Sequence, residues 1–330
     1  MRKPVETLRE LGKIVIECIN TWRFVNFFIT TACTCRCVMC DFWRKDKAFI
    51  SDFAFREAID ILEGLGFYNY SLTGGEPLLH PQFFKFVKYL KHKGLYANSP
   101  TNGTLLTEKN VRRLKESGID SVSVSIDSLN PEIADKIRGH PGQLRKALNG
   151  LKLLKKHGIP RSVIILLAKH NIHDFSEMVK RFDEDYDAPS VLCFPDSGIG
   201  SIDEIDFTKS ELVNVIDELL YLKKQGYRLL NVNEYLLDIK RAYLGQRRHL
   251  PCHGGYSVIN VYWDGSVTPC FNKDPICNVR ELSISRLKKE NCQRCLNQCF
   301  IEFSYISECM KRKQYFTILK ERNAAITLHF

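Results

Sequence analysis

The chain has 330 residues, of which 44% are hydrophobic and 26% are charged. These values are ordinary for a soluble globular protein, and no low-complexity tract interrupts them. No window of 18 residues lacks charge as a transmembrane helix must, which excludes an integral membrane protein of that kind. Lys and Arg (48) outnumber Asp and Glu (38), for a net charge of +10. This balance favours an anionic partner: a phosphorylated substrate, an acidic redox protein, RNA or a membrane surface.

Thirteen cysteines are present, most of them within residues 33–40 and 252–309. Nothing at the N-terminus resembles a cleavable signal peptide, so the cysteines predict metal binding in a reducing, cytoplasmic compartment in preference to disulfides. The most apolar stretch, residues 14–29, is interrupted by Glu17 and Arg23. We expect a helix followed by the first strand here, with peripheral membrane contact as the alternative.

After an N-terminal helical segment at residues 4–20, predicted strands and helices alternate. Short apolar runs rich in β-branched and aromatic residues predict strands at residues 24–30, 68–73, 95–99, 121–127, 162–168 and 190–194. Apolar residues at helical spacing predict helices at residues 55–65, 82–92, 108–117, 144–157 and 175–183. Six successive β-then-α units predict an α/β fold: a partial (β/α)6 TIM-like barrel, open on one side, with functional residues at the carboxyl ends of the strands.

The character of the chain changes after a strong helix predicted at residues 208–226. Residues 251–310 are rich in cysteine, glycine and turn signals, and a hairpin is predicted there, with Trp263-Asp264-Gly265 between strands 258–261 and 267–268. We therefore divide the chain at a boundary between residues 240 and 251. The predicted parts are a helical segment (1–21), a barrel core (22–205), a helical connection (206–250), a small Cys-rich domain with a hairpin and a helix (251–310), and a basic tail (311–330).

Four cysteines lie within eight residues directly after the first predicted strand. The chain between them is too short for a disulfide to contribute much stability. Clustered thiolates suit soft metals or iron–sulfur clusters. Cys33, Cys37 and Cys40 form the pattern C-x3-C-x2-C. Three cysteine ligands would leave one iron of a four-iron cluster without a protein ligand, and an open metal position is typical of a catalytic site. A structural zinc site is the alternative, although ligands so crowded make poor tetrahedral geometry.

This C-x3-C-x2-C pattern after a first strand resembles the signature of the radical S-adenosylmethionine (radical SAM) superfamily. In that family the residue before the third cysteine is usually aromatic, and its backbone lies near the adenine of the cofactor. Here the residue is Met39, which fills a similar space. Cys35 lies off the pattern, and we expect it to be a bystander thiol.

A second motif, Gly74-Gly75-Glu76-Pro77, follows the second predicted strand. Paired glycines at a strand end allow a ligand to approach the backbone without meeting a Cβ. A tight turn without a ligand is the alternative. The motif resembles the GGEP motif of the radical SAM family, and the resemblance implies that it cradles the amino group of S-adenosylmethionine.

Further cofactor-binding candidates lie at later strand ends. Asn102 follows the third strand, while Ser123, Ser125 and Asp127 alternate on the fourth and so share the face that a barrel turns inward. Polar groups there need partners: either the ribose hydroxyls of a cofactor or one another and water. The resemblance implies that Arg138 points at the cofactor carboxylate, a task that suits its bidentate fork. A surface arginine is the alternative.

The C-terminal cysteines form a third group. Cys252 and Cys270 stand in C-x12-G-x4-C around the predicted hairpin, and C-x2-C-x3-C follows. This arrangement resembles the SPASM extension of the family or its shorter form, twitch, although the x5 segment of a full SPASM motif is absent. The resemblance implies one auxiliary [4Fe–4S] cluster, and a zinc ribbon is the alternative. Its implied ligands are Cys252 and Cys270 with two of Cys292, Cys295 and Cys299, while Cys277 and Cys309 are spare or complete a second cluster.

The resemblance implies an enzyme that cleaves S-adenosylmethionine reductively at a [4Fe–4S] cluster and uses the resulting 5′-deoxyadenosyl radical to take a hydrogen atom from a peptide, a cofactor or sugar, or a lipid precursor. It also implies a low-potential electron donor of the ferredoxin or flavodoxin type. Phe271 stands where relatives carry a catalytic aspartate, so we assign no catalytic residue. An RNA-modifying enzyme with a zinc-like module and a non-catalytic iron–sulfur carrier are the alternatives.

Overall fold

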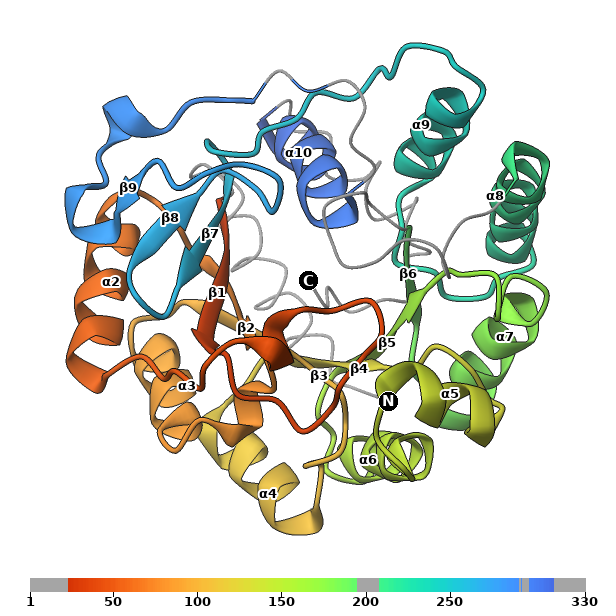
Figure 1. The fold of residues 1–330 in the computed structure, drawn as a ribbon, viewed down its shortest axis with the longest axis horizontal. Helices are drawn as coiled ribbons and strands as arrows, with labels where there is room; N and C mark the ends of the chain where they lie inside the picture. The colour runs from red at the N-terminus through yellow and green to blue at the C-terminus, as the bar shows by residue number, and fades with distance from the viewer. Residues whose placement is uncertain (1–22, 195–207, 291, 293–296, 312–330) are drawn as a thin grey trace, which may run out of the picture.

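The computed structural model describes residues 23–194, 208–290, 292 and 297–311, so the expected N-terminal helical segment and most of the basic tail lie outside the described residues. The described strands form a single sheet in the order β6-β5-β4-β3-β2-β1-β7-β8-β9. Strands β1 to β6 are parallel neighbours that curl into an open barrel (Figure 1). Their bounds are β1 Phe24–Thr30, β2 Asn69–Gly74, β3 Tyr96–Thr101, β4 Ser121–Ser125, β5 Arg161–Leu166, β6 Ser190–Cys193, β7 Val258–Tyr262, β8 Ser266–Thr268 and β9 Cys277–Asn278.

Helices cover the outside of the barrel (Figure 1). Their bounds are α2 Asp52–Gly64, α3 Phe83–His92, α4 Glu108–Ser117, α5 Pro131–Arg138, α6 Gln143–Lys156, α7 Phe175–Tyr186, α8 Lys209–Lys224, α9 Asn233–Tyr243 and α10 Gln298–Lys311. Short 3-10 turns occur at η1 Phe42–Arg44, η2 Pro77–Leu79, η3 Val279–Glu281 and η4 Ile284–Arg286. Within the described part of the chain, no helix has both the length and the apolar character needed to cross a membrane.

The main core lies between the sheet and the outer helices. All seven residues of β1 are buried, because helices cover one side of this strand and the barrel interior lies on the other. Phe27 of β1 packs on Phe55 of α2, whose ring stacks on Phe86 of α3 with centroids 3.9 Å apart. Burying aromatic rings of this kind contributes most of the stabilisation of such a core.

The six strands predicted for the barrel core all form, and each predicted helix between them is present within a few residues of its expected bounds. Helix α5, between β4 and α6, was not predicted. It spans only eight residues and buries two of them, Ala134 and Ile137, so its periodic signal is weak. Its start is nevertheless marked in the sequence, because Asn130 caps the helix and Pro131 occupies its first turn.

The predicted hairpin is present as β7 and β8, and it continues the barrel sheet. Strand β7 pairs in parallel with β1, while β7 and β8 pair in antiparallel fashion. The sheet is therefore continuous across the boundary that we placed between residues 240 and 251. The division into domains stays a prediction.

Helix α10 lies across the open side of the barrel, between β7 and β6 (Figure 1). On one side Phe303 stacks on Phe24 of β1, with ring centroids 4.3 Å apart, and Ser304 Oγ accepts a hydrogen bond from the His253 amide at 2.6 Å. On the other side the buried Glu302 carboxylate accepts hydrogen bonds from Asn231 and from the amide of Val232. These contacts make α10 a wall of the barrel interior.

Candidate functional site

The cysteine loop, residues 33–40, leaves the carboxyl end of β1 and is held by backbone hydrogen bonds to the end of α5. The amides of Arg36 and Val38 donate to the carbonyls of Arg138 and Ile137, both at 3.0 Å. Gly139 follows with φ +56°, and a Cβ there would lie 2.4 Å from the carbonyl oxygen of Arg36. A left-handed, side-chain-free residue is therefore required at this contact. The unpredicted helix α5 thus positions the loop that carries the cysteine motif.

The four thiols of this loop are unequal. Cys33 and Cys40 are half-buried, whereas Cys35 and Cys37 are buried. Burial raises the pKa of Cys33 to about 11 and also raises that of Cys40. A hydrogen bond from Cys35, assisted by the Arg138 guanidinium, lowers the pKa of Cys37 to about 6. Cys35, which we expected to be a bystander, therefore contacts a candidate ligand.

The thiols fit a four-iron cluster better than a single ion. Among the described residues, no three or more His, Cys, Asp or Glu side chains are arranged to hold one metal ion. In a [4Fe–4S] cluster each cysteine binds a different iron, so the ligands stand around the cluster and do not converge on one point. Cys33, Cys37 and Cys40 share one packed cluster with Met39, and their charges act on one another. The donor set and its clustering fit the group.

The Gly74-Gly75 pair packs against the segment that leads into the cysteine loop. Gly75 donates to the Thr30 carbonyl at 2.8 Å, and Glu76 donates to that of Ala32 at 2.7 Å. A Cβ at Gly74 would lie 2.1 Å from Thr30 O, and one at Gly75 would lie 2.2 Å from Ala32 O. The glycines are therefore required by backbone-to-backbone packing, whatever ligand they also approach.

Glu76 is fully buried and ties the second strand end to the third. Its carboxylate accepts hydrogen bonds from Thr101 Oγ1 at 2.8 Å, the Asn102 amide at 2.9 Å and the Leu78 amide at 3.2 Å. Burial outweighs these bonds and raises the pKa of Glu76 to about 7. Pro77, which begins η2, is also buried.

Asn102 contacts the cysteine loop directly. Its side-chain nitrogen donates to Thr34 Oγ1 at 2.9 Å and lies 3.7 Å from Cys33 Sγ. Its side-chain oxygen accepts from the amide and hydroxyl of Thr104, at 2.9 and 2.7 Å. In this structure Asn102 orients the loop, and its role toward a cofactor stays a prediction.

Arg138 and Asp127 form a buried ion pair beneath the cysteine loop, with Nη2 2.6 Å from Oδ2. Arg138 Nη1 lies 3.9 Å from Cys37 Sγ, and Arg138 Nε is buried with no hydrogen-bond partner in the described part of the structure. Asp127 also accepts from the Leu166 amide at 3.0 Å. Arg138 is thus an inward-facing residue with a donor left for an anion. Ser125 ends β4, two residues before Asp127, and is half-buried. Its carbonyl oxygen accepts a hydrogen bond from the Gln143 side chain at 3.1 Å.

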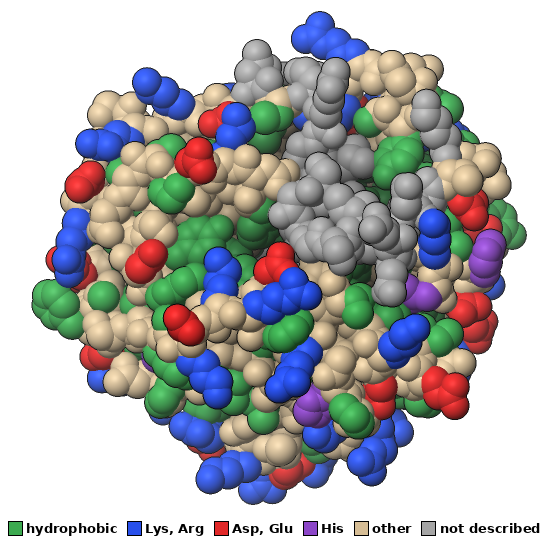
Figure 2. All heavy atoms as spheres, in the orientation of Figure 1, with side chains coloured by type: hydrophobic (Ala, Val, Ile, Leu, Met, Phe, Trp, Pro, Cys, Tyr) green, Lys and Arg blue, Asp and Glu red, His purple; other side chains and the backbone are tan. Residues whose placement is uncertain are grey.

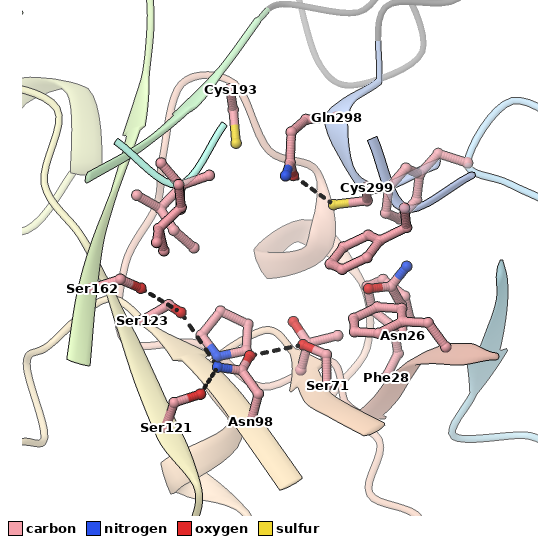
Figure 3. Close-up of a pocket in the computed structure, with 18 residues that line it drawn as sticks. Asn26, Phe28, Ser71, Asn98, Ser121, Ser123, Ser162, Cys193, Gln298 and Cys299 are labelled. Atoms are coloured by element: carbon pink, nitrogen blue, oxygen red, sulfur yellow. Dashed lines mark hydrogen bonds between the residues drawn. The ribbon is translucent and has the colours of Figure 1, made fainter. Parts of the chain in front are cut away.

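A cavity of about 270 Å³ fills the barrel interior (Figure 3). Its floor is a network of amide and hydroxyl groups: Asn98 Nδ2 donates to Ser121 Oγ at 2.8 Å and to Ser123 Oγ at 3.3 Å, and Ser162 donates to Ser123 at 3.0 Å. Ser123 is therefore hydrogen-bonded within this layer, and its role toward a ribose stays a prediction. The described residues that line the cavity include no charged side chain.

An outer cavity of about 560 Å³ adjoins the interior one and shares Phe28 and Phe271 with it. The hairpin supplies Tyr262 and Trp263 to this outer cavity, and the cysteine loop supplies Cys40. Figure 2 shows a hydrophobic hollow over β1 and β7 on this face, while basic and acidic side chains are scattered around it. The outer cavity thus lies beside the cysteine loop, and the two residues that it shares with the interior cavity place the two next to each other.

The C-terminal cysteines divide into two sets. Cys252 and Cys270 flank the hairpin, and the Cys292 thiol is close enough to raise the pKa of both, after the larger effect of burial. Cys299, in contrast, lines the barrel cavity together with Cys193. Its pKa is raised to about 12, mainly by burial. Cys295 lies outside the described residues, Cys277 lies on β9, and Cys309 is buried on α10.

Residues 27–182 match the radical SAM superfamily. These residues therefore form a radical SAM domain. Among curated relatives, it is 32% identical over 166 residues to the AdoMet-dependent heme synthase of Methanosarcina barkeri, covering 49% of this chain and 48% of that protein. It is 28% identical over 251 residues to the subtilosin biosynthesis protein AlbA of Bacillus subtilis, covering 74% of this chain and 54% of AlbA. The chain thus spans about half the length of the curated relatives that it matches.

Solved structures of radical SAM enzymes share the fold. SuiB of Streptococcus suis, bound to its precursor peptide SuiA, superposes with a TM-score of 0.63 at 15% identity, covering 86% of this chain and 69% of SuiB. The enzyme anSMEcpe with bound AdoMet gives 0.63 at 17% identity, covering 92% of this chain and all (100%) of that one. The partial barrel that we predicted is therefore confirmed. Members of this superfamily use a [4Fe–4S] cluster and S-adenosylmethionine.

Several residues of the candidate site were not identified from the sequence. Cys193 is an isolated cysteine in an apolar run, and nothing local distinguishes it from a core residue. Gln298 and Gln143 are single polar residues at helix starts, and only the tertiary structure places one at the cavity and the other beneath Asn102. The pairing of Asp127 with Arg138 could have been suspected, because a charge that follows a buried strand requires a partner.

Proposed function

We propose that this chain is an enzyme that takes a hydrogen atom from a group held in the barrel cavity, using S-adenosylmethionine and a [4Fe–4S] cluster ligated by Cys33, Cys37 and Cys40. One observation carries the proposal: the turn at Gly74 and Gly75 is held by backbone hydrogen bonds to the segment that leads into the cysteine loop, and Gly74 and Cys40 both line the outer cavity beside the barrel cavity. The bound cofactors supply a 5′-deoxyadenosyl radical. The residues of the chain supply position and exclusion of water.

The residues around the loop suit the binding of an amino acid moiety. Arg138 Nε is a buried donor without a hydrogen-bond partner among the described residues, which suits a carboxylate. Gly74 lines the outer cavity, and we expect the amino group to lie beside its backbone. Ser125 and Asp127 are our candidates for the ribose and Met39 for the adenine, while Glu76, Pro77 and Asn102 hold the two loops in place.

We infer that the substrate is a peptide. Its support is the similarity to AlbA and to a PqqA peptide cyclase of Ruegeria pomeroyi, which is 28% identical over 123 residues. The cavities agree with this substrate. The interior one has the volume of a side chain or two and no charged lining, while the outer one is wider and aromatic. A tetrapyrrole bearing carboxylates, the small-molecule alternative raised by the heme synthase relatives, finds no cationic partner among the described residues of the interior cavity.

We further propose one auxiliary cluster beside the hairpin. Cys252, Cys270 and Cys292 supply three thiols that act on one another, and Cys295 is the natural fourth ligand because it stands three residues after Cys292. Such a cluster would carry an electron to or from the cavity. A donor of the ferredoxin or flavodoxin type and a cytoplasmic location remain our expectations for the whole protein.

The test is iron and sulfide content after anaerobic reconstitution, together with a dithionite-driven assay for 5′-deoxyadenosine. Wild type should bind about eight irons and a Cys33/Cys37/Cys40→Ala variant about four, with 5′-deoxyadenosine formed only by wild type. If wild type instead binds about four irons and one zinc, the C-terminal region holds no auxiliary cluster and is a structural or RNA-binding zinc module. Full iron without 5′-deoxyadenosine would favour a non-catalytic carrier and contradict the proposal.

A further inference from the structure

Two cysteine thiols line the barrel cavity. Cys193 ends β6 and Cys299 stands in the first turn of α10, and both sulfur atoms point into the cavity (Figure 3). The two segments are distant in sequence and meet only because α10 closes the barrel. The Cys299 sulfur lies 3.6 Å from Gln298 Oε1. Both cysteines are free, and the surface that they retain lines the cavity.

Cys299 packs in the same hydrophobic cluster as Cys252 and Cys270, but unlike them it lines the barrel cavity. Cys252, Cys270 and Cys292 influence one another, whereas the group that acts most strongly on Cys193, after its burial, is Cys299. Phe271 and Phe300, whose rings meet edge to face with centroids 5.5 Å apart, pack between the hairpin and this part of α10. The family resemblance implied two of Cys292, Cys295 and Cys299 as cluster ligands. The cavity gives it a different environment.

The surroundings of the two thiols favour hydrogen-atom transfer to a radical over reactions of an ionised thiolate. It has no charged side chain among its described lining residues, and burial disfavours the thiolate form. An S–H bond is weaker than the C–H bond of an alkyl group. A thiol beside a carbon radical therefore gives up its hydrogen atom in a downhill step.

We propose that Cys193 and Cys299 form a hydrogen-atom donor pair for carbon radicals generated in the barrel cavity. One S–H bond breaks homolytically, one C–H bond forms, and the sulfur is left as a thiyl radical. One electron from the low-potential donor and one proton from solvent return the thiyl to a thiol. For a substrate radical, the net result is a carbon that has exchanged its hydrogen, without a net change in its oxidation state. This inference rests on the proposed function.

The first experiment needs no substrate. Reconstituted wild-type protein is supplied with S-adenosylmethionine and dithionite in D₂O, so that the pocket thiols carry deuterium. The 5′-deoxyadenosine formed is then analysed by mass spectrometry. We expect one deuterium in most of the product from wild type and its loss in a Cys193→Ser/Cys299→Ser variant. Serine keeps size and polarity, but its O–H bond is too strong to donate. The single variants assign the donor.

A second readout does not depend on turnover. The iron content of the Cys193→Ser/Cys299→Ser variant should equal that of wild type, because neither thiol ligates a cluster. The matched control is Cys277→Ser on β9, a residue that lines neither cavity, and it should change neither the iron content nor the deuterium label. In the cluster-free chain, iodoacetamide should alkylate Cys193 and Cys299 more slowly than Cys277, because the cavity restricts access to them.

The outcomes separate this inference from the proposed function. Absence of 5′-deoxyadenosine in wild type would overturn both. Unlabelled 5′-deoxyadenosine from wild type, or a label that persists in the double variant, would overturn the donor pair alone. Loss of about four irons in the Cys299→Ser variant would make Cys299 a cluster ligand and would also overturn it.

Discussion

The two cysteine-rich regions of this protein bring their thiols together in different ways. In the loop of residues 33–40 the thiols are close in sequence. The loop is held by backbone hydrogen bonds to α5, and the segment just before it is held to the turn after β2. Around the hairpin, the thiols come from separate segments that meet because β7 adds to the sheet beside β1 and α10 crosses the open side. Substitutions that alter the backbone or a buried charge should therefore lower the stability of the first region strongly. The second region should lose less stability, because its side chains can adjust.

The largest expected effect comes from Asp127→Asn, which removes the charge opposite Arg138 beneath the cysteine loop. A buried guanidinium without its counter-charge should destabilise the cluster-free chain by about 3–5 kcal/mol in chemical denaturation. The matched control is Asp41→Asn, because Asp41 pairs with Arg44 at 3.0 Å on the exposed surface. The control should change stability by less than about 1 kcal/mol. Equal losses of stability in both variants would show that the buried ion pair contributes no more than an exposed one.

Glu76 gives a prediction about pH. Its pKa is raised by burial from 4.5 to about 7, so the folded state binds the proton more tightly than the unfolded state. Its contribution to stability is present below pH 4.5 and is lost as the pH rises through 7, by about 3 kcal/mol. Denaturation of wild type and Glu76→Gln across this range should show a steeper decline for wild type. Parallel curves would contradict the assignment.

Gly75→Ala tests the backbone contact between the two loops. The new Cβ would meet Ala32 O at 2.2 Å, and a backbone atom in a hydrogen-bonded segment cannot move aside cheaply. We expect a loss of about 2 kcal/mol or more, measured as a fall in denaturation midpoint. Gly64→Ala, at the end of α2 with nothing within 4 Å, should instead stabilise by about 0.5–1 kcal/mol.

The smallest effect is expected on the hairpin side, from Gly265→Ala. Gly265 has φ +83°, but the nearest atom to a new Cβ is the side-chain nitrogen of Asn278 at 2.7 Å. That side chain can rotate away, so the cost should be mostly backbone strain, about 1 kcal/mol. A loss larger than that of Gly75→Ala would reverse the comparison between the two regions.

The order of strands and helices in the barrel could be predicted because each unit carries its own periodic pattern. The cysteine motif and the GGEP turn could be identified for the same reason, because each lies within a few consecutive residues. Helix α5 was missed because its apolar signal is short, although the cap at Asn130 marks its start. The contacts of Arg138 with Asp127 and of Asn102 with Thr34 join separate strand ends, and no local pattern contains them.

The sequence by itself determined the barrel, its open side, the cysteine loop and the glycine turn, because these depend on residues near one another in the chain. Only the tertiary structure decided which face of α10 lines the barrel cavity. The family resemblance implied a cluster completed by two of Cys292, Cys295 and Cys299, and the fold places Cys299 on the barrel cavity that Cys193 also lines. A helix one residue out of register would present a different side chain, so such an assignment depends on packing that local spacing does not contain.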